Sequence, residues 1–215
     1  MKNLQFKQLL LLSDTQKKAN QFLFQKRFNL ITADDNSVGK STLAKLLLWT
    51  FGCEPDFDST WKSTDCKCLV DFSIDGTNYK ILRYQNFISL KEENKEILNY
   101  TNIGGDYSKK FAELVDFKVL LPKRGSNETE LITPPPAYYF LPFYMDQKNS
   151  WSKTWNSFGK LGQFDSWQKT VIKYHLGYLS PKHFELEQDL SDNKRQINEL
   201  NQEVEKIGYA LDVVK

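Results

Sequence analysis

Apolar and polar positions along the chain first follow the pattern of strands and then that of a helix. Leu4 to Leu12 is rich in leucine and predicts a strand, and the apolar centre of Gln21 to Gln25 predicts a second one. Phe28 to Thr32 is short and mostly apolar, which is typical of a buried strand. The polar residues 33–38 predict a loop. Leucines at helical spacing then predict a helix that ends at Gly52, a natural C-cap.

Hairpins are predicted in the middle of the chain. Asp75-Gly76 separates two alternating runs, Cys66 to Ile74 and Thr77 to Tyr84, and this dipeptide is a strong turn signal. A second hairpin is predicted within Phe87 to Tyr100. The residues 107–117 that follow are predicted to form a helix.

An aromatic-rich region follows three consecutive prolines. Tyr138 to Met145 is a dense apolar run, and Pro142 within it indicates an edge strand or a bulge. Residues 148–168 carry three of the five tryptophans. These aromatic residues either pack a small helical lobe or form an exposed binding surface, and packing is the favoured interpretation.

The C-terminal region has the seven-residue repeat of a coiled coil. Ser180 is a good N-cap and Pro181 suits the first helical position. Apolar residues then recur at two core positions, with Asn193 in one slot of the seam. We therefore expect a head lobe at residues 1–179 and the start of a coiled-coil arm at residues 180–215, with an ordinary amphipathic helix as the alternative. The seam consists of Leu186, Leu190, Ile197, Leu200, Val204, Ile207, Leu211 and Val214.

The composition is that of an ordinary globular chain. The 215 residues are 40% hydrophobic and 14% aromatic, which excludes a disordered chain and allows one sizeable domain with an appendage. The formal net charge is +2, so any surface for nucleic acid has to be local. Three cysteines suit a reducing compartment. No apolar stretch is long enough for a signal peptide or a membrane span, so we expect a cytoplasmic protein without a membrane partner.

Candidate chemistry lies where the polar loop meets the predicted helix. Gly39-Lys40-Ser41-Thr42, between a predicted strand and a predicted helix, has the context of a phosphate-binding P-loop. In such a loop backbone N–H groups bind phosphate oxygens, Lys40 binds the β- and γ-phosphates, and the Ser41 hydroxyl ligates Mg²⁺. The pattern asks for glycine at position 34, where this chain has Asp34. The candidate nucleotide-binding residues are Asn36, Ser37, Val38, Gly39, Lys40, Ser41 and Thr42.

The order of these elements resembles that of the SMC-like ABC ATPases, which include the SMC, RecN and RecF groups. Asn36-x-x-Gly39-Lys40-Ser41-Thr42 after a strand pair is similar to their Walker A region, and Tyr79-Lys80-Ile81-Leu82-Arg83 is similar to their Y-x-I-x-R strand. Tyr144-Met145-Asp146-Gln147 resembles their Q-loop, whose glutamine reaches Mg²⁺ and the attacking water. The run LPFYMDQ, with W-x-x-x-W-x-S-F and Tyr174-His175-x-Gly177, resembles SMC-like ATPases of bacterial defence systems such as Lamassu.

This resemblance implies an α/β fold: an ABC-type P-loop NTPase head lobe, with a mixed sheet around the P-loop helix and an emerging coiled-coil helix. It implies that ATP and Mg²⁺ are bound, that Lys40 and Gln147 are catalytic, and that Ser41 and Gln147 hold the metal. The sequence has no LSGG-type signature and no apolar strand that ends in Asp-Glu. The implied partners are therefore a C-terminal lobe with the Walker B and signature motifs, a second SMC-like head, DNA, and accessory subunits.

We accordingly expect an ATPase that joins two heads through ATP and acts on DNA, in genome maintenance or in anti-phage and anti-plasmid defence. A P-loop kinase or phosphotransferase is one alternative, although it leaves the heptads unexplained. A non-enzymatic coiled-coil interaction protein with a degenerate P-loop is another, and Asp34 is the residue that keeps it open.

Overall fold

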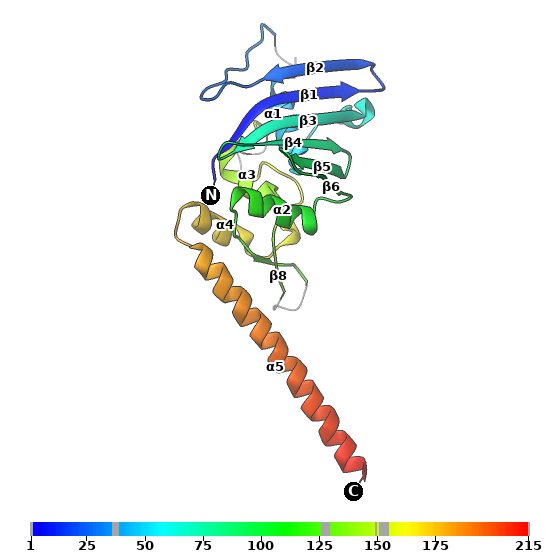
Figure 1. Ribbon diagram of the computed structural model, residues 1–215, viewed down its shortest axis with the longest axis vertical. Coiled ribbons are helices and arrows are strands. Elements are labelled where there is room, and N and C mark those ends of the chain that lie inside the picture. The colour runs from blue at the N-terminus through cyan, green and yellow to red at the C-terminus, as the bar shows by residue number, and fades with distance from the viewer. Residues whose placement is uncertain (1, 36–38, 126–129, 149, 151–154, 215) are drawn as a thin grey trace. The chain divides into compact units, whose positions relative to one another are not determined.

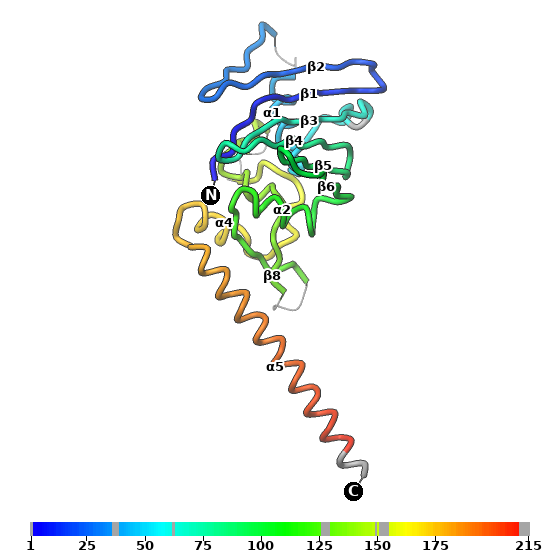
Figure 2. The backbone as a smooth tube through the Cα atoms, viewed as in Figure 1, coloured from blue at the N-terminus to red at the C-terminus, as the bar shows by residue number. Residues whose placement is uncertain are grey.

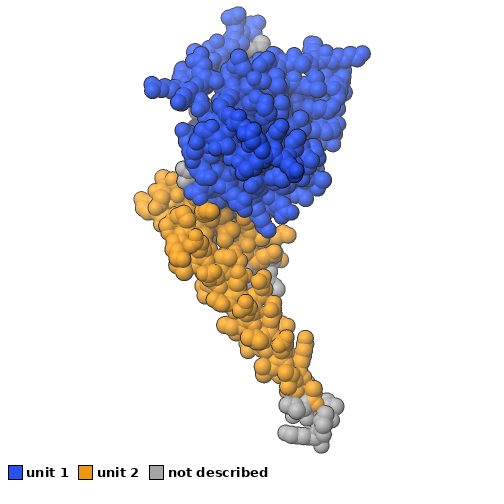
Figure 3. Space-filling view, viewed as in Figure 1, with its two compact units in different colours: residues 1–117, 134–161 blue, residues 118–133, 162–215 orange. Residues whose placement is uncertain are grey.

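The computed structural model describes residues 2–35, 39–125, 130–148, 150 and 155–214 (Figures 1 and 2). The chain divides into two compact units (Figure 3). The first unit contains residues 1–117 and 134–161, and the second contains residues 118–133 and 162–215. The domain boundary expected at residue 180 stays a prediction.

An antiparallel sheet is the framework of the first unit. Its six described strands lie in the order β2-β1-β3-β4-β5-β6 (Figure 1). Both predicted hairpins are confirmed, and the turn between β3 and β4 has Asp75 and Gly76 at φ of 47° and 90°. The strands are β1 (Leu4–Ser13), β2 (Lys18–Leu23), β3 (Cys66–Ile74), β4 (Thr77–Tyr84), β5 (Phe87–Glu92) and β6 (Ile97–Tyr100).

Helices of the first unit bury one face of this sheet. α1 packs against β3 and β4, and it ends as predicted, with Phe51 as C-cap and Gly52 at φ of 94°. Phe51 is fully buried, and its ring contacts those of Phe6, Phe72, Phe111 and Phe140 at centroid distances between 4.9 and 6.1 Å. This cluster is the centre of the core. The helices are α1 (Lys40–Thr50), η1 (Trp61–Thr64), α2 (Asp106–Val115), α3 (Ala137–Phe140) and η2 (Leu141–Phe143).

Phe28 to Thr32, expected as a buried strand, does not form one. The described residues contain no strand between β2 and α1, and Phe28 and Leu30 are each 75% exposed. A parallel strand needs a neighbour that runs in the same direction, and every described pair in this sheet is antiparallel. Within the described residues the expected mixed sheet is therefore corrected to an antiparallel sheet, and the apolar segment before α1 is left uncovered.

The apolar run from Tyr138 to Met145, expected as an edge strand or a bulge, is helical over most of its length. α3 and the 3₁₀ helix η2 follow one another from Ala137 to Phe143. Pro136 is the N-cap of α3, and Pro142 lies in the first positions of η2. A missing N–H costs no helical hydrogen bond at such positions, so these prolines start helices here.

The second unit is a small aromatic-centred lobe at the base of α5. The Tyr174 hydroxyl accepts a hydrogen bond from the Lys118 backbone N–H at 3.1 Å, and the Tyr174 ring contacts the Phe184 ring at 5.6 Å. Phe164 and Trp167 are also buried, so packing is the correct interpretation for them, whereas Trp151 lies outside the described residues. The remaining elements are β7 (Leu121–Pro122), β8 (Leu131–Ile132), η3 (Leu161–Gln163), α4 (Trp167–His175) and α5 (Pro181–Val214).

α5 starts at Pro181 as predicted, and the carbonyl of Ser180 accepts a hydrogen bond from His183 N–H at 3.1 Å. The apolar seam along this helix is exposed to solvent from Leu186 to Ile207, and pairing with another helix stays a prediction. No helix in the described part of the chain is both long and apolar enough to cross a bilayer. Exposed fractions lie between 49% and 67% for Leu186, Leu190, Ile197, Leu200, Val204 and Ile207.

Candidate nucleotide-binding site

The start of α1 has the backbone geometry of an anion-binding helix terminus. Gly39 is the N-cap and has a left-handed conformation, with φ of 91° and ψ of 13°. Its carbonyl accepts the first helical hydrogen bond, from Leu43 N–H at 2.9 Å. The N–H groups of Lys40, Ser41 and Thr42 precede that bond and have no acceptor within the helix. Together with the positive end of the helix dipole they favour a negative group at this position.

Glycine is required at position 39 for its backbone angles. A Cβ on Gly39 would meet no heavy atom within 4 Å, so space for a side chain exists. Its positive φ, however, lies in a region that L side chains rarely adopt. The glycine therefore serves the turn into α1.

The Lys40 side chain reaches back to Asp35. Its Nζ donates a hydrogen bond to the carbonyl oxygen of Asp35 at 2.7 Å. Asp34 and Asp35 are both exposed, so their carboxylates are hydrated, which weakens their conflict with a bound phosphate. The three remaining loop residues of the prediction lie outside the described residues: Asn36, Ser37 and Val38.

The loop that carries Gln147 is anchored by a buried aspartate. Asp146 is 2% exposed, and its backbone N–H donates to Ser150 Oγ at 2.9 Å. Its carboxylate Oδ2 accepts a hydrogen bond from Lys148 N–H at 3.0 Å. Gln147 itself is exposed, so its amide is accessible to a ligand.

Tyr144 completes the surroundings of this carboxylate. Its hydroxyl donates to Asp146 Oδ1 at 3.2 Å, and its ring stacks on the Phe158 ring at 5.4 Å. Burial raises the pKa of the Tyr144 hydroxyl well above its usual value of 10.0, and the negative charge of Asp146 adds to this shift. Tyr144 therefore remains a neutral hydrogen-bond donor at physiological pH.

Two lysines connect Asp146 to α1 and to the loop after α1. Lys45 Nζ lies 3.2 Å from Asp146 Oδ1 and also donates to the carbonyl oxygen of Asp56. Lys148 Nζ lies 3.1 Å from Asp56 Oδ2. Lys45, Asp146, Lys148 and Asp56 thus form a closed circuit of ion pairs and hydrogen bonds, which we call the four-residue ring. Its members all belong to the first unit.

The four-residue ring brings two predicted segments together. Lys45 follows Ser41 by four residues, so both side chains lie on one face of α1. The Gln147 loop is therefore attached to the helix face that begins at the GKST sequence. Sequence reasoning selected Gln147 but missed Lys45 and Asp146, although the helical spacing from Ser41 could have singled out the lysine.

Arg83, in the strand that resembles the Y-x-I-x-R pattern, fixes the C-terminal end of α1. It is 2% exposed and donates to the carbonyl oxygens of Trp49 and Cys53. It also forms an ion pair with Glu54 at 2.7 Å. A positive charge at the last turn of a helix is favourable. The middle of α1, through Lys45, and its C-terminal end, through Arg83, are thus tied to the rest of the first unit.

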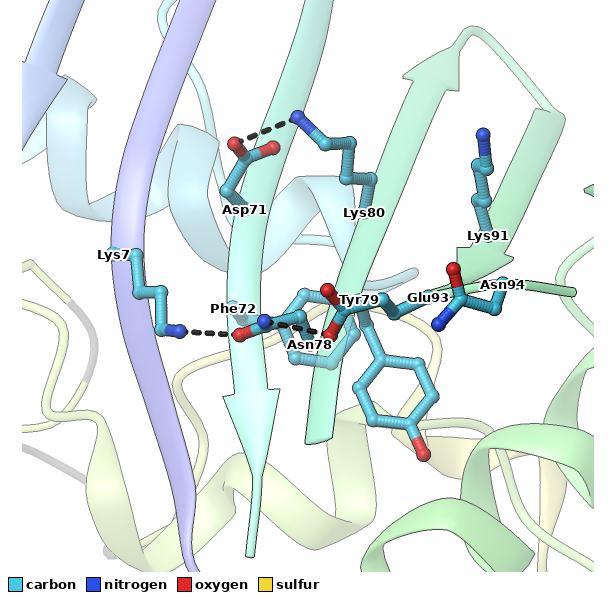
Figure 4. A pocket seen from close by; sticks show the side chains of 9 residues that line it. All are labelled: Lys7, Asp71, Phe72, Asn78, Tyr79, Lys80, Lys91, Glu93 and Asn94. Carbon is cyan, nitrogen blue, oxygen red and sulfur yellow. Dashed lines mark hydrogen bonds and ion pairs between the residues drawn. The ribbon is translucent and has the colours of Figure 1, made fainter. Parts of the chain in front are cut away.

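A separate cavity of about 460 Å³ lies on the face of the sheet that points away from α1 (Figure 4). Lys80 and Lys91, which line it, alternate with core residues along their strands. Its charges are mixed, because Lys80 pairs with Asp71 at 3.0 Å and Glu93 lines the same cavity. Of the predicted nucleotide-binding residues, the four that the structure describes do not line it.

No protein-family model matches the chain, but two known proteins are similar to it in sequence. The chain is 27% identical over 180 residues to "Lamassu protein LmuB" of Bacillus cereus (strain VD014). This aligned region covers 83% of this chain and 31% of that protein. It is also 27% identical over 136 residues to a "Lamassu protein LmuB" of another Bacillus strain. That aligned region covers 63% of this chain and 23% of the relative. The chain thus spans less than a third of the curated relatives it matches. Over most of its own length, the chain is similar in sequence to Lamassu LmuB proteins of Bacillus.

Proposed function

We propose that this chain is the ATP-binding N-terminal lobe of an SMC-like ATPase. The observation that carries the proposal is the GKST sequence at the left-handed N-cap of α1, with the Gln147 loop tied to the same helix. The N–H groups at residues 39–42 and the Lys40 ammonium would bind the phosphates of ATP. Lys40 would also stabilise the charge that develops on the γ-phosphate during hydrolysis.

Mg²⁺ fits the oxygen donors of this region. The Ser41 hydroxyl is exposed in the first turn of α1, and the Gln147 amide is exposed on the loop tied to that helix. Hydroxyl and amide oxygens suit this hard cation, and Ser41 and Gln147 would hold it beside the phosphates. When bound, Mg²⁺ would neutralise part of the triphosphate charge.

The uncovered segment before α1 supports a partner lobe. Phe28 and Leu30 expose apolar side chains just before the GKST sequence, and neither is part of a described strand. A C-terminal lobe with Walker B and signature motifs would pair with this segment and cover it. We infer that this chain binds ATP alone, hydrolyses it only with that lobe, and joins a second head when ATP is bound.

The process that this ATPase serves is inferred from its relatives. Similarity to LmuB supports a role in anti-phage or anti-plasmid defence. DNA as the target, accessory subunits as partners and the cytoplasm as the location follow from the SMC-like resemblance.

A second candidate is a non-enzymatic coiled-coil interaction protein. The exposed seam of α5 favours it, because that seam needs a partner whether or not nucleotide is bound. A phosphotransferase would leave the same seam without a purpose. ATP binding therefore distinguishes the two remaining candidates.

Calorimetric titration with ATP and Mg²⁺ tests the proposal. The wild-type chain should bind ATP, and Lys40→Ala should abolish binding while its melting temperature stays unchanged. Lys91→Ala, on the far face of the sheet, is the matched control and should bind as the wild type does. No binding by the wild type, with or without a C-terminal lobe, would favour the coiled-coil candidate.

A further inference from the structure

Asp146 is buried, so its carboxylate depends on the ion pair with Lys45 for a compensating charge. The Asp146 side chain is 1% exposed and that of Lys45 is 15% exposed. A carboxylate removed from water requires a compensating charge or several hydrogen-bond donors. The Lys45 ammonium supplies the charge from α1, so the position of the Asp146 loop depends on that helix.

The position of Lys45 on α1 determines what else lies nearby. Four residues of α-helix separate it from Ser41, which is a rise of about 6 Å on the same face. Gln147 directly follows the aspartate that Lys45 holds. A proposed ligand of Mg²⁺ on the helix and a proposed ligand on the loop are thereby connected through one ion pair.

Other contacts keep the loop folded when the ion pair is absent. The Asp146 backbone N–H bonds to Ser150 Oγ, and Ser157 Oγ donates to the carbonyl of Tyr144 at 2.7 Å. The exposed Lys148 still connects the loop to Asp56. Removing the Lys45 charge should therefore shift the loop relative to α1 and leave the unit folded.

We propose that Lys45 is a positioning residue: through Asp146 it holds the Gln147 amide at the Mg²⁺ side of the nucleotide-binding end of α1. This inference rests on the proposed function, since it assumes that ATP and Mg²⁺ bind there. In this role Lys45 would act through Asp146 and would not itself bind ATP or the metal. Its effect is limited to the part of the ATP affinity that depends on Mg²⁺.

The test measures the affinity of the full chain for a fluorescent ATP analogue twice, in excess Mg²⁺ and in EDTA. The ratio of the two dissociation constants gives the gain due to Mg²⁺. Lys45→Gln should reduce this gain by roughly tenfold, as loss of residues that orient metal ligands does, and should leave the affinity in EDTA unchanged. Lys45→Arg should retain the gain, because it keeps the charge.

Two further variants make the test specific. Lys45→Gln combined with Asp146→Asn removes both charges, so no unpaired buried carboxylate is left to destabilise the chain. This double variant should lose as much of the gain due to Mg²⁺ as Lys45→Gln does. Lys91→Gln is the same substitution at an exposed lysine on the far face of the sheet, and it should behave as the wild type does.

The outcomes separate this inference from the proposed function. If Lys45→Gln and the double variant both gain as much ATP affinity from Mg²⁺ as the wild type does, the positioning role is overturned while ATP binding still stands. Equal losses in Mg²⁺ and in EDTA would show a purely structural role and would also overturn it. If the wild-type chain binds no nucleotide in either condition, both the proposed function and the inference fail.

Discussion

The guanidinium carbon of Arg83 lies 4.2 Å from the centre of the Trp49 ring, and Arg83 also donates a hydrogen bond to the Trp49 carbonyl. Arg83 comes from β4 and Trp49 from the last turn of α1. One buried side chain thus combines a cation–π contact, capping of helix carbonyls and an ion pair with Glu54. This relationship fixes α1 to the sheet.

Arg83→Lys should destabilise the chain although it preserves the charge. A lysine ammonium cannot reproduce the planar fork that bonds Trp49, Cys53 and Glu54 together. We expect the free energy of unfolding to fall by about 2 kcal/mol, measured by urea denaturation. Lys80→Arg, at an exposed position of the same strand, should change it by less than about 0.5 kcal/mol. An Arg83→Lys variant as stable as the wild type would contradict this account.

Gly39→Ala and Gly52→Ala should have different consequences. Both glycines have φ above 90°, so alanine at either position costs about 1 kcal/mol of backbone strain. At Gly52 the new Cβ would also lie 2.9 Å from Ile103 Cγ2, so the total loss should be roughly 3 kcal/mol. Gly39→Ala should lose only this backbone strain of about 1 kcal/mol. It should bind ATP roughly tenfold more weakly, which corresponds to about 1.4 kcal/mol.

Melting curves and ATP titrations of the two glycine variants check this contrast. The expected pattern is a binding defect with the smaller loss of stability at position 39, and the larger loss of stability at position 52. Equal stability of the two variants would mean that the crowding at Gly52 is relieved by the Ile103 side chain.

Stability should decline at alkaline pH because of Cys68. Burial, followed by the neighbouring Cys66, raises the pKa of the Cys68 thiol from 9.0 to about 12. Above pH 9 the unfolded chain loses this proton while the folded chain keeps it, so the stabilising contribution is full below pH 9 and decreases up to about pH 12. This thiol alone gives a slope of about 1.4 kcal/mol per pH unit.

Cys68→Ala checks this pH dependence by urea denaturation between pH 8 and pH 10.5. The variant should start from a lower stability, because a buried side chain is shortened, and should then decline less steeply than the wild type. Parallel curves for the two proteins would show that Cys68 does not titrate with the shift described.

Leu200→Asp should disrupt pairing of α5. Leu200 is 59% exposed in the single chain, so the substitution removes little packing within it. If the seam pairs with another helix, a buried carboxylate there is costly, and oligomer size and helical content should both fall. Gln202→Asp, on the outer side of the same helix, is the control and should alter neither. Sedimentation and circular dichroism measure the two quantities, and unchanged values for Leu200→Asp would indicate an ordinary amphipathic helix.

Elements whose information is local were predictable. The Asp75-Gly76 turn specifies its own hairpin because both residues tolerate positive φ. The end of α1 just before Gly52 and the start of α5 at Pro181 follow from capping preferences in the same way. Gly39 at the N-cap of α1 belongs to this class, and so does the candidate site as far as it depends on that turn.

Elements whose state depends on a neighbour were predicted wrongly or missed. Phe28 to Thr32 has the composition of a strand, but composition supplies no partner to bond with. The run that contains Pro142 is apolar on all sides, so periodicity could not separate strand from helix.

The sequence by itself determined the turns, the caps and the helix with its GKST start, since each depends on the angles that a few adjacent residues prefer. Only the tertiary structure decided that Lys45 meets Asp146 and that Arg83 lies under Trp49, because these pairs are far apart in the chain. Such pairs form where burial removes water from the charges, and burial depends on how the whole first unit packs.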